Sequence, residues 1–153
     1  MSVTSTASFH LSDSLLNGGN NGIGITPKSP SFQAVLTNTS IRNMKSGALV
    51  GGFGGVSASF HMTGGELSNT SATAVQIGPG VWTFTGVTFK QNRDFTIYLQ
   101  DGSVVMRACT VTGNGGGVDV FVIPPPIWAP VTAPATTYFR TPVLASRLKA
   151  ASA

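Results

Sequence analysis

The chain has 153 residues, of which 9% are charged and 41% are hydrophobic, and its formal net charge is +4. This length predicts one domain, or one domain with an extension, and its surface must be neutral because ordinary soluble domains are about 25% charged. Lys and Arg form no run and no recognisable basic helix, which argues against a nucleic-acid partner. No apolar stretch is long enough to predict a membrane span.

The first ten residues lack a basic start followed by an apolar run. We therefore expect no secretory signal, and synthesis in a host cytoplasm. Residues 1–6 are interpreted as a cap or extension that precedes a repeat over residues 7–122.

The repeat is defined by five apolar anchors that are separated by 25, 26, 22 and 22 residues. These anchors are Leu16, Ile41, Leu67, Phe89 and Val111. Two apolar residues stand seven and five positions before each anchor, which is the alternation of a half-buried strand. The pairs are Phe9 and Leu11, Ala34 and Leu36, Phe60 and Met62, Trp82 and Phe84, and Val104 and Met106.

A second alternating pair follows each anchor, which predicts a second strand in every repeat. These pairs are Ile23 and Ile25, Ala48 and Val50, Val75 and Ile77, Ile97 and Leu99, and Val118 and Val120. An Asn lies in the turn between the anchor and this pair, at positions 17, 43, 69, 92 and 114. Since Asn tolerates a left-handed backbone, we expect it at sharp bends, with side-chain amides bonded from coil to coil.

Short strands, tight bends and a period of 22 to 26 residues predict a solenoid whose equivalent strands pair in parallel, about 4.8 Å apart. The anchors, the flanking alternation and the asparagine turns resemble the right-handed parallel β-helix of the pectate-lyase-like superfamily, which includes bacteriophage tailspikes and other virion proteins. The expected fold class is therefore all-β, a short right-handed parallel β-helix of about five coils. A β-sandwich is the alternative, but it predicts hairpin turns such as Asn-Gly between its strands, for which we take NNG at residues 20–22 as the candidate.

Enzymes of the family that the chain resembles gather acids on one outer face, either to hold calcium or to act as an acid and base. Here Asp13, Glu66, Asp94, Asp101 and Asp119 all fall at different offsets from their anchors. Asp101 and Asp119 come closest to a pair, and we interpret them as solvated turn and strand residues. We therefore expect a protein that is not an enzyme, with no catalytic residue, no cofactor and no metal site.

Three outward features carry alternative interpretations. His10 and His61 share an offset, but Val35 lies between them, so a contact surface is expected rather than one zinc site. Ser12, Thr37, Thr63, Thr85 and Arg107 form a largely hydroxyl column that needs no ligand, although sugar binding, with Tyr98 as an exposed aromatic, is the functional alternative. Cys109, the single cysteine, is interpreted as a small core residue.

Residues 123–153 are expected to form an extended proline-rich C-terminal arm, because six of them are Pro. The arm contains three bases and no acid, which makes an acidic protein surface a plausible target. Its apolar and basic side chains are the predicted partner-binding residues. They are Ile127, Trp128, Tyr138, Phe139, Arg140, Val143, Leu144, Arg147 and Leu148.

The resemblance and the arm together predict a structural protein on the surface of a bacteriophage virion. A capsid decoration or cement protein is favoured over a tailspike, since a tailspike helix is typically much longer. The expected partners are a coat (major capsid) or tail protein and neighbouring copies of the chain, with no nucleic acid and no membrane. A glycan-binding or glycan-cleaving β-helix is the alternative function.

Overall fold

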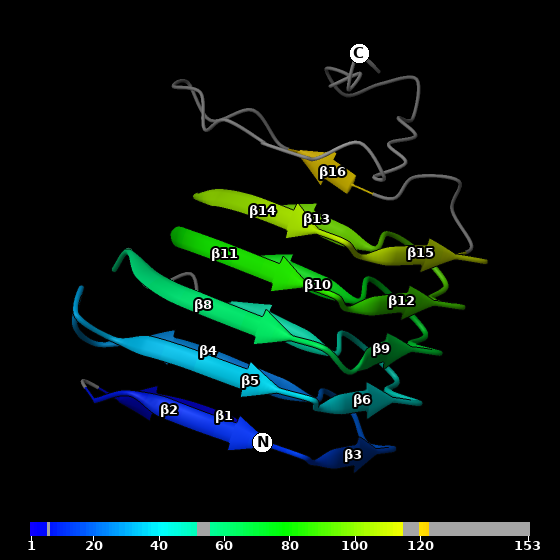
Figure 1. Cartoon of the computed structure of the whole chain (residues 1–153), viewed down its shortest axis with the longest axis horizontal. Coiled ribbons are helices and arrows are strands. Elements are labelled where there is room, and N and C mark those ends of the chain that lie inside the picture. Colours follow the sequence, from blue (N-terminus) through cyan, green and yellow to red (C-terminus); the bar gives the residue numbers. More distant parts are fainter. Residues whose placement is uncertain (6, 52–55, 115–119, 123–153) are drawn as a thin grey trace.

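The computed structural model describes residues 1–5, 7–51, 56–114 and 120–122, and it confirms an all-β parallel solenoid of about five turns (Figure 1). Every strand pairing in it is parallel, which rules out the β-sandwich. The described residues contain no helix, and hence none that is long and apolar enough to cross a membrane. The predicted arm and its nine partner-binding residues lie outside the described part of the chain.

Three sheets run along the stack, and each coil contributes one strand to each sheet. Sheet A consists of β1 (Ser2–Ser5), β4 (Ile23–Pro27), β7 (Leu49–Gly51), β10 (Val75–Ile77), β13 (Ile97–Leu99) and β16 (Val120–Val122). Sheet B consists of β2 (Phe9–Ser12), β5 (Gln33–Thr37), β8 (Ala58–Thr63), β11 (Gly80–Thr85) and β14 (Ser103–Arg107). Sheet C consists of β3 (Leu15–Asn17), β6 (Ser40–Arg42), β9 (Glu66–Ser68), β12 (Thr88–Lys90) and β15 (Thr110–Thr112).

The predicted register of sheets B and C is confirmed. The five anchors pair with one another in order along sheet C, from Leu16 to Val111. The alternating pairs before the anchors stack in sheet B in the same way, with Phe60 level with Ala34 on one side and Trp82 on the other. The period-2 pattern succeeds here because each strand buries one face only.

The register of sheet A corrects two of the predicted pairs. In the second coil Leu49 pairs with Ile23 and Val75, so the strand is shifted by one residue from the predicted pair Ala48 and Val50. In the last coil Val120 pairs with Ile97 and Val122 with Leu99, whereas Val118 and Val120 were predicted to occupy these positions. Ala48 is nevertheless fully buried, in the bend before β7, which is why its apolar character misled the alignment.

Ten of the fourteen described residues with positive φ form two columns, and each column marks a bend that recurs in every coil. Between sheets B and C the column has φ of 47° to 65° and comprises Asp13, Asn38, Gly64, Gly86 and Ala108. After sheet C the column has φ of 52° to 77° and comprises Gly18, Asn43, Asn69, Gln91 and Gly113. Asn, Asp and Gly adopt this conformation at the lowest cost, so the bends explain part of the Asn pattern.

The predicted amide ladder exists, but it is divided between the outside and the inside of the solenoid. On the outside, Asn43 Nδ2 donates to Asn17 Oδ1 at 2.6 Å, and Asn69 Nδ2 donates to Asn43 Oδ1. On the inside, Asn92 Nδ2 donates to Asn114 Oδ1 at 3.1 Å. Asn92 is fully buried and does not have a positive φ, so it serves as a buried polar link and not as a bend residue.

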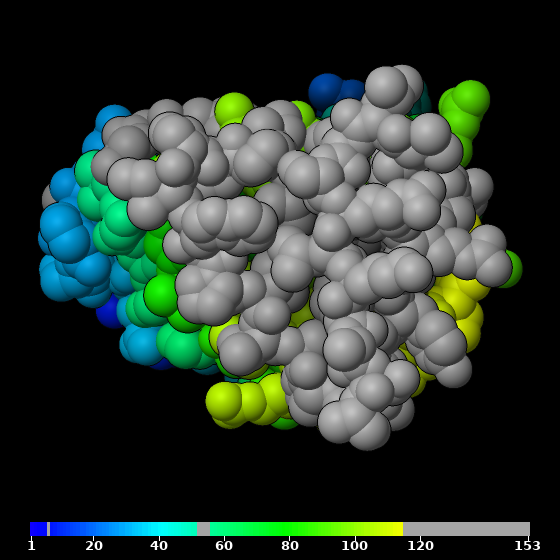
Figure 2. Space-filling model, turned by 90° about the horizontal axis from the view of Figure 1, so that it is seen from above, coloured from blue at the N-terminus to red at the C-terminus, as the bar shows by residue number. Residues whose placement is uncertain are grey.

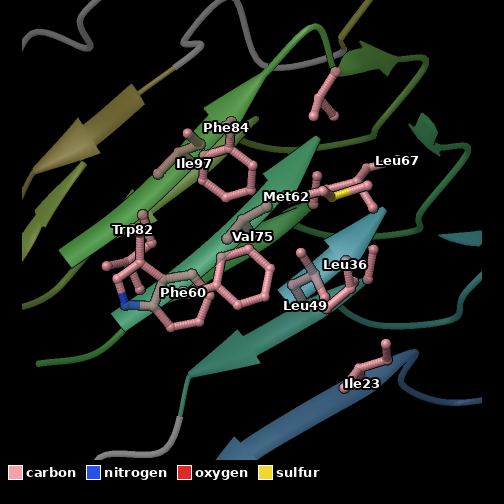
Figure 3. Packing of buried hydrophobic residues seen from close by; sticks show 14 of the residues in the cluster. Ile23, Leu36, Leu49, Phe60, Met62, Leu67, Val75, Trp82, Phe84 and Ile97 are labelled. Carbon is pink, nitrogen blue, oxygen red and sulfur yellow. The ribbon is translucent and has the colours of Figure 1, made fainter. Parts of the chain in front are cut away.

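The core is a continuous apolar column whose aromatic part lies against sheet B. The rings of Phe60 and Trp82 stack with centroids 4.5 Å apart, and Phe84 meets Phe89 edge to face at 5.4 Å. Figure 3 shows Phe60, Trp82 and Phe84 pointing toward one another inside the solenoid. Stacking of coils is what buries these rings, since no single coil has an interior of its own.

The coils differ in the number of residues that they contain. The first two repeats are 25 and 26 residues long and the next two are 22, and the longer coils place their extra residues in the bends between sheets A and B. Figure 2, a view along the stack, shows blue and cyan side chains of the N-terminal coils projecting past the later coils on one side. The three sheets, by contrast, stay in register along the whole stack.

Candidate functional site

The outer face of sheet B carries the hydroxyl column that the sequence predicts. Ser12 pairs with Thr37, Thr37 with Thr63, Thr63 with Thr85 and Thr85 with Arg107. All are exposed except Thr85, which is half-buried. Because strands are about 4.8 Å apart, the column is a regular row of short polar groups that ends in one positive charge.

The two histidines lie on the same face, in the next outward column. His10 pairs with Val35, and Val35 pairs with His61, so the two imidazoles are two strand steps apart, about 10 Å. Among the described residues, no group of three or more His, Cys, Asp or Glu side chains is arranged to hold a metal ion. The role of the histidines in a contact surface remains a prediction.

The four described carboxylates occupy four different parts of the coil. Asp13 lies in the bend between sheets B and C, Glu66 in sheet C, Asp94 in the turn after sheet C and Asp101 in the turn before β14. Asp101 Oδ1 accepts a hydrogen bond of 2.6 Å from the backbone N–H of Gly102, as a turn residue does. Asp119, its suggested companion, lies outside the described residues.

Glu66 belongs to a small charged cluster on the outer face of sheet C, which the sequence reasoning missed. Lys90 Nζ lies 2.7 Å from Glu66 Oε2, and Ser68 Oγ donates to Glu66 Oε1. Partial burial raises the pKa of Glu66, but hydrogen bonds from Lys90 and Ser68 and the positive charges of Lys90 and Arg42 outweigh it, so the pKa lies below its ordinary value. The sequence contained a signal for this ion pair, because Glu66 directly precedes one anchor and Lys90 directly follows the next.

On sheet A, Tyr98 is an outward aromatic residue, as predicted. Its ring is stacked with that of Phe95 at a centroid distance of 6.3 Å, and Tyr98 is level with Gln76 in the coil before. Both aromatic residues are half-buried. An aromatic ring beside an amide side chain is chemistry that a sugar ring can use.

Two remaining features are structural. Cys109 is half-buried against the core, and burial raises the pKa of its thiol despite weak hydrogen bonds to backbone groups. A pocket at the bend between sheets A and B has a volume of about 10 Å³ and is lined by Pro27, Phe32, Phe60, Pro79 and Trp82 among others. That volume corresponds to about one water molecule, so the pocket is a packing defect in an apolar bend.

Comparison with known proteins adds no relative. No family model, no curated protein and no solved structure gives a significant match to this chain.

Proposed function

We propose that this protein is a non-enzymatic structural component of a bacteriophage particle, a capsid decoration or cement protein that is attached through residues 123–153. The observation that carries the proposal is the near absence of charge from two of the three faces of the solenoid. Sheets A and B comprise 11 strands, and these described strands contain one charged residue, Arg107. Depletion of charge is typical of surfaces that other protein covers.

The arm gives the proposal its mode of attachment. It combines Trp128, Tyr138 and Phe139 with Arg140 and two further bases, and it contains no acid. Aromatic residues and Arg are the residue types enriched where binding energy concentrates in interfaces. The assignment to a bacteriophage particle rests on the resemblance of the repeat to virion β-helices.

The test has two steps. Mass spectrometry of purified particles is expected to detect the chain in fixed stoichiometry with the coat protein, and its absence from the particles overturns the proposal. The full chain and a chain lacking residues 124–153 are then mixed with particles that lack the protein and are sedimented. Only the full chain is expected to sediment with them, and a matched Thr112→Glu variant of the full chain, altered on sheet C, is expected to sediment equally well. Circular dichroism checks that the truncated chain is folded.

Glycan binding is the second candidate, and the Phe95 and Tyr98 ring pair beside Gln76 is the observation that favours it. Sedimentation with capsular or pectic polysaccharides measures binding, and Tyr98→Ala is expected to abolish it while Thr88→Ala on sheet C leaves it intact. Cleavage of the polysaccharide that is lost when Asp101 or Asp119 is substituted contradicts the proposal that the protein is not an enzyme.

A further inference from the structure

Sheet B presents the broadest face of the solenoid. Its strands contain 4, 5, 6, 6 and 5 residues, whereas all strands of sheet C contain 3. With strands about 4.8 Å apart and a rise of about 3.3 Å per residue, these 26 residues cover about 410 Å². Two such faces in contact bury about 820 Å², which is below the roughly 1,000 Å² of a stable interface and corresponds to a weak, concentration-dependent dimer.

The side chains on this face suit contact with another protein surface. Most are short hydroxyl or apolar side chains, Arg107 is the one Lys, Arg, Asp or Glu residue in the strands of this face, and Val81 is 48% exposed. The outward residues include Ser59, His61 and Thr63 of the central strand β8, Val81 of β11 and Arg107 of β14. Short side chains lose little conformational entropy when they are covered.

Opposite charges stand at the two ends of the edge where sheet B bends into sheet C. Arg107 ends β14 in the last coil, and Asp13 follows β2 in the first coil. Four strand steps, about 19 Å, separate them, so they do not meet within one molecule. Both are exposed, and within the described residues neither belongs to an ion pair, although Asp13 accepts a hydrogen bond from Asn38.

We propose that the outer face of sheet B is an interface between two copies of this chain, related by a twofold axis parallel to the strands. This axis reverses the order of the coils and keeps the direction of the strands. Arg107 of each copy then lies opposite Asp13 of the other, so that an ion pair closes each end of the interface. The axis passes through β8, the central strand, where Ser59, His61 and Thr63 face their own counterparts.

The charges favour this axis over one parallel to the stack. The other axis places Arg107 opposite Asp101 of the second copy, which joins the copies at one end only. Asp101 is also turned toward the backbone of its own turn, where it accepts the hydrogen bond from Gly102. Isologous twofold contacts are the commonest arrangement of protein homo-oligomers.

The interface is tested by sedimentation equilibrium of the full chain over a range of concentrations. Thr63→Arg places a charge on the twofold axis and is expected to raise the dimer dissociation constant at least about 100-fold. Thr112→Arg is the matched control, because it changes an exposed Thr on sheet C to the same residue and is expected to leave the constant unchanged. Circular dichroism and urea unfolding confirm that both variants fold.

A double-mutant cycle tests the ion pair. Arg107→Gln and Asp13→Asn are each expected to weaken the dimer about 5- to 10-fold, and the chain with both changes is expected to be no weaker than either single variant. Asn tolerates the left-handed backbone of residue 13, so Asp13→Asn does not strain the bend. Arg107→Glu is expected to weaken the dimer further, and adding Asp13→Asn to it restores part of the loss.

Three results overturn the proposal. One is an unaltered chain that remains monomeric at about 500 µM, because its free energy of association is then weaker than about −4 kcal/mol. A second is an oligomer that persists in Thr63→Arg but is lost when residues 124–153 are deleted, which assigns association to the arm. A third is coupling of Arg107 to Asp101 instead of Asp13, which excludes the proposed axis. None of these results depends on whether the protein belongs to a virus particle.

Discussion

Asn92 links three successive coils through one side chain. Its Nδ2 donates to Asn114 Oδ1 in the next coil and to the carbonyl oxygen of Leu67 in the coil before, each at 3.1 Å. Its Oδ1 accepts from the backbone N–H of Thr70 at 3.2 Å and from Thr70 Oγ1 at 3.0 Å. Because Asn92 is fully buried, these partners lie away from bulk water.

We expect Asn92→Ala to lower the free energy of unfolding by about 2–4 kcal/mol, because Thr70 N–H and the Leu67 carbonyl lose a buried partner. Asn43→Gly is the matched control, since it removes an exposed amide from the outer ladder but keeps a residue that accepts positive φ. Its expected cost is at most about 1 kcal/mol. Urea unfolding followed by circular dichroism measures both, and equal losses contradict a special role for the buried amide.

Two glycines with similar φ allow the energetic cost of a left-handed backbone to be distinguished from the cost of a steric clash. Gly65 has φ of 82°, and a Cβ on it would lie 2.1 Å from the carbonyl oxygen of Thr39. Gly86 has φ of 64°, and a Cβ there would meet nothing within 4 Å. Gly86→Ala is therefore expected to cost about 1–2 kcal/mol from conformation alone, whereas Gly65→Ala also forces two coils apart and is expected to cost at least about 3 kcal/mol.

Soluble yield and the midpoint of urea unfolding measure the loss of stability in both glycine variants. An insoluble Gly65→Ala chain beside a soluble Gly86→Ala chain agrees with the expected order. Equal urea midpoints show that the two coils move apart at residue 65 at no added cost. They contradict a tight contact between a Cβ at Gly65 and the carbonyl oxygen of Thr39.

Much of the fold was predictable because each strand of a solenoid buries one face, and the same apolar pattern recurs in every coil. Residues seven and five places before each anchor identified sheet B correctly in every coil. The same reasoning misplaced two of the five pairs after the anchors, and in the second coil it did so because the bend before sheet A is itself buried. Ala48 and Leu49 are both inaccessible to solvent, so apolar character did not reveal which of them begins the strand.

The asparagines show a similar limit. Asn43 and Asn69 stand two residues after their anchors and have positive φ. Asn92, which is fully buried, and its half-buried partner Asn114 stand three residues after theirs and do not. A difference of one position separates a bend residue from a buried hydrogen-bonding residue, and the sequence contains no other sign of it. The predicted binding residues of the arm lie outside the described residues, so they remain predictions.

The pH dependence of stability includes a contribution from Glu66. Its pKa in the folded chain lies below the ordinary value of 4.5, so its ion pair stabilises the fold above that value and the stabilisation is lost as the pH falls through the folded pKa. The Lys90 and Glu66 side chains are 42% and 24% exposed, so solvent screening limits the contribution to at most about 1 kcal/mol. We expect Glu66→Gln to lower stability at pH 7 and to make it less dependent on pH below about 5.

Urea unfolding at pH 7 and pH 3 tests this expectation, with Asp94→Asn as a control at an exposed carboxylate. The difference between Glu66→Gln and the unaltered chain is expected to shrink in 1 M NaCl. A difference that stays the same at pH 3 shows that the side chain acts through packing instead of charge.

Cys109 provides a probe of the last complete coils, because it is the single cysteine of the chain. Its thiol is half-buried, and its sulfur lies 3.5 Å from the carbonyl oxygens of Phe84 and Arg107. Burial raises the pKa of the thiol, so less reactive thiolate is present near pH 8 than in an unfolded chain. We expect iodoacetamide to alkylate the native protein several-fold more slowly than the urea-unfolded protein at pH 8. We also expect the alkylation rate of the native protein to keep rising at pH values where the rate of the unfolded protein has levelled off. A Cys109→Ser chain supplies the blank, and native and unfolded rates that coincide across this pH range contradict the burial of the thiol.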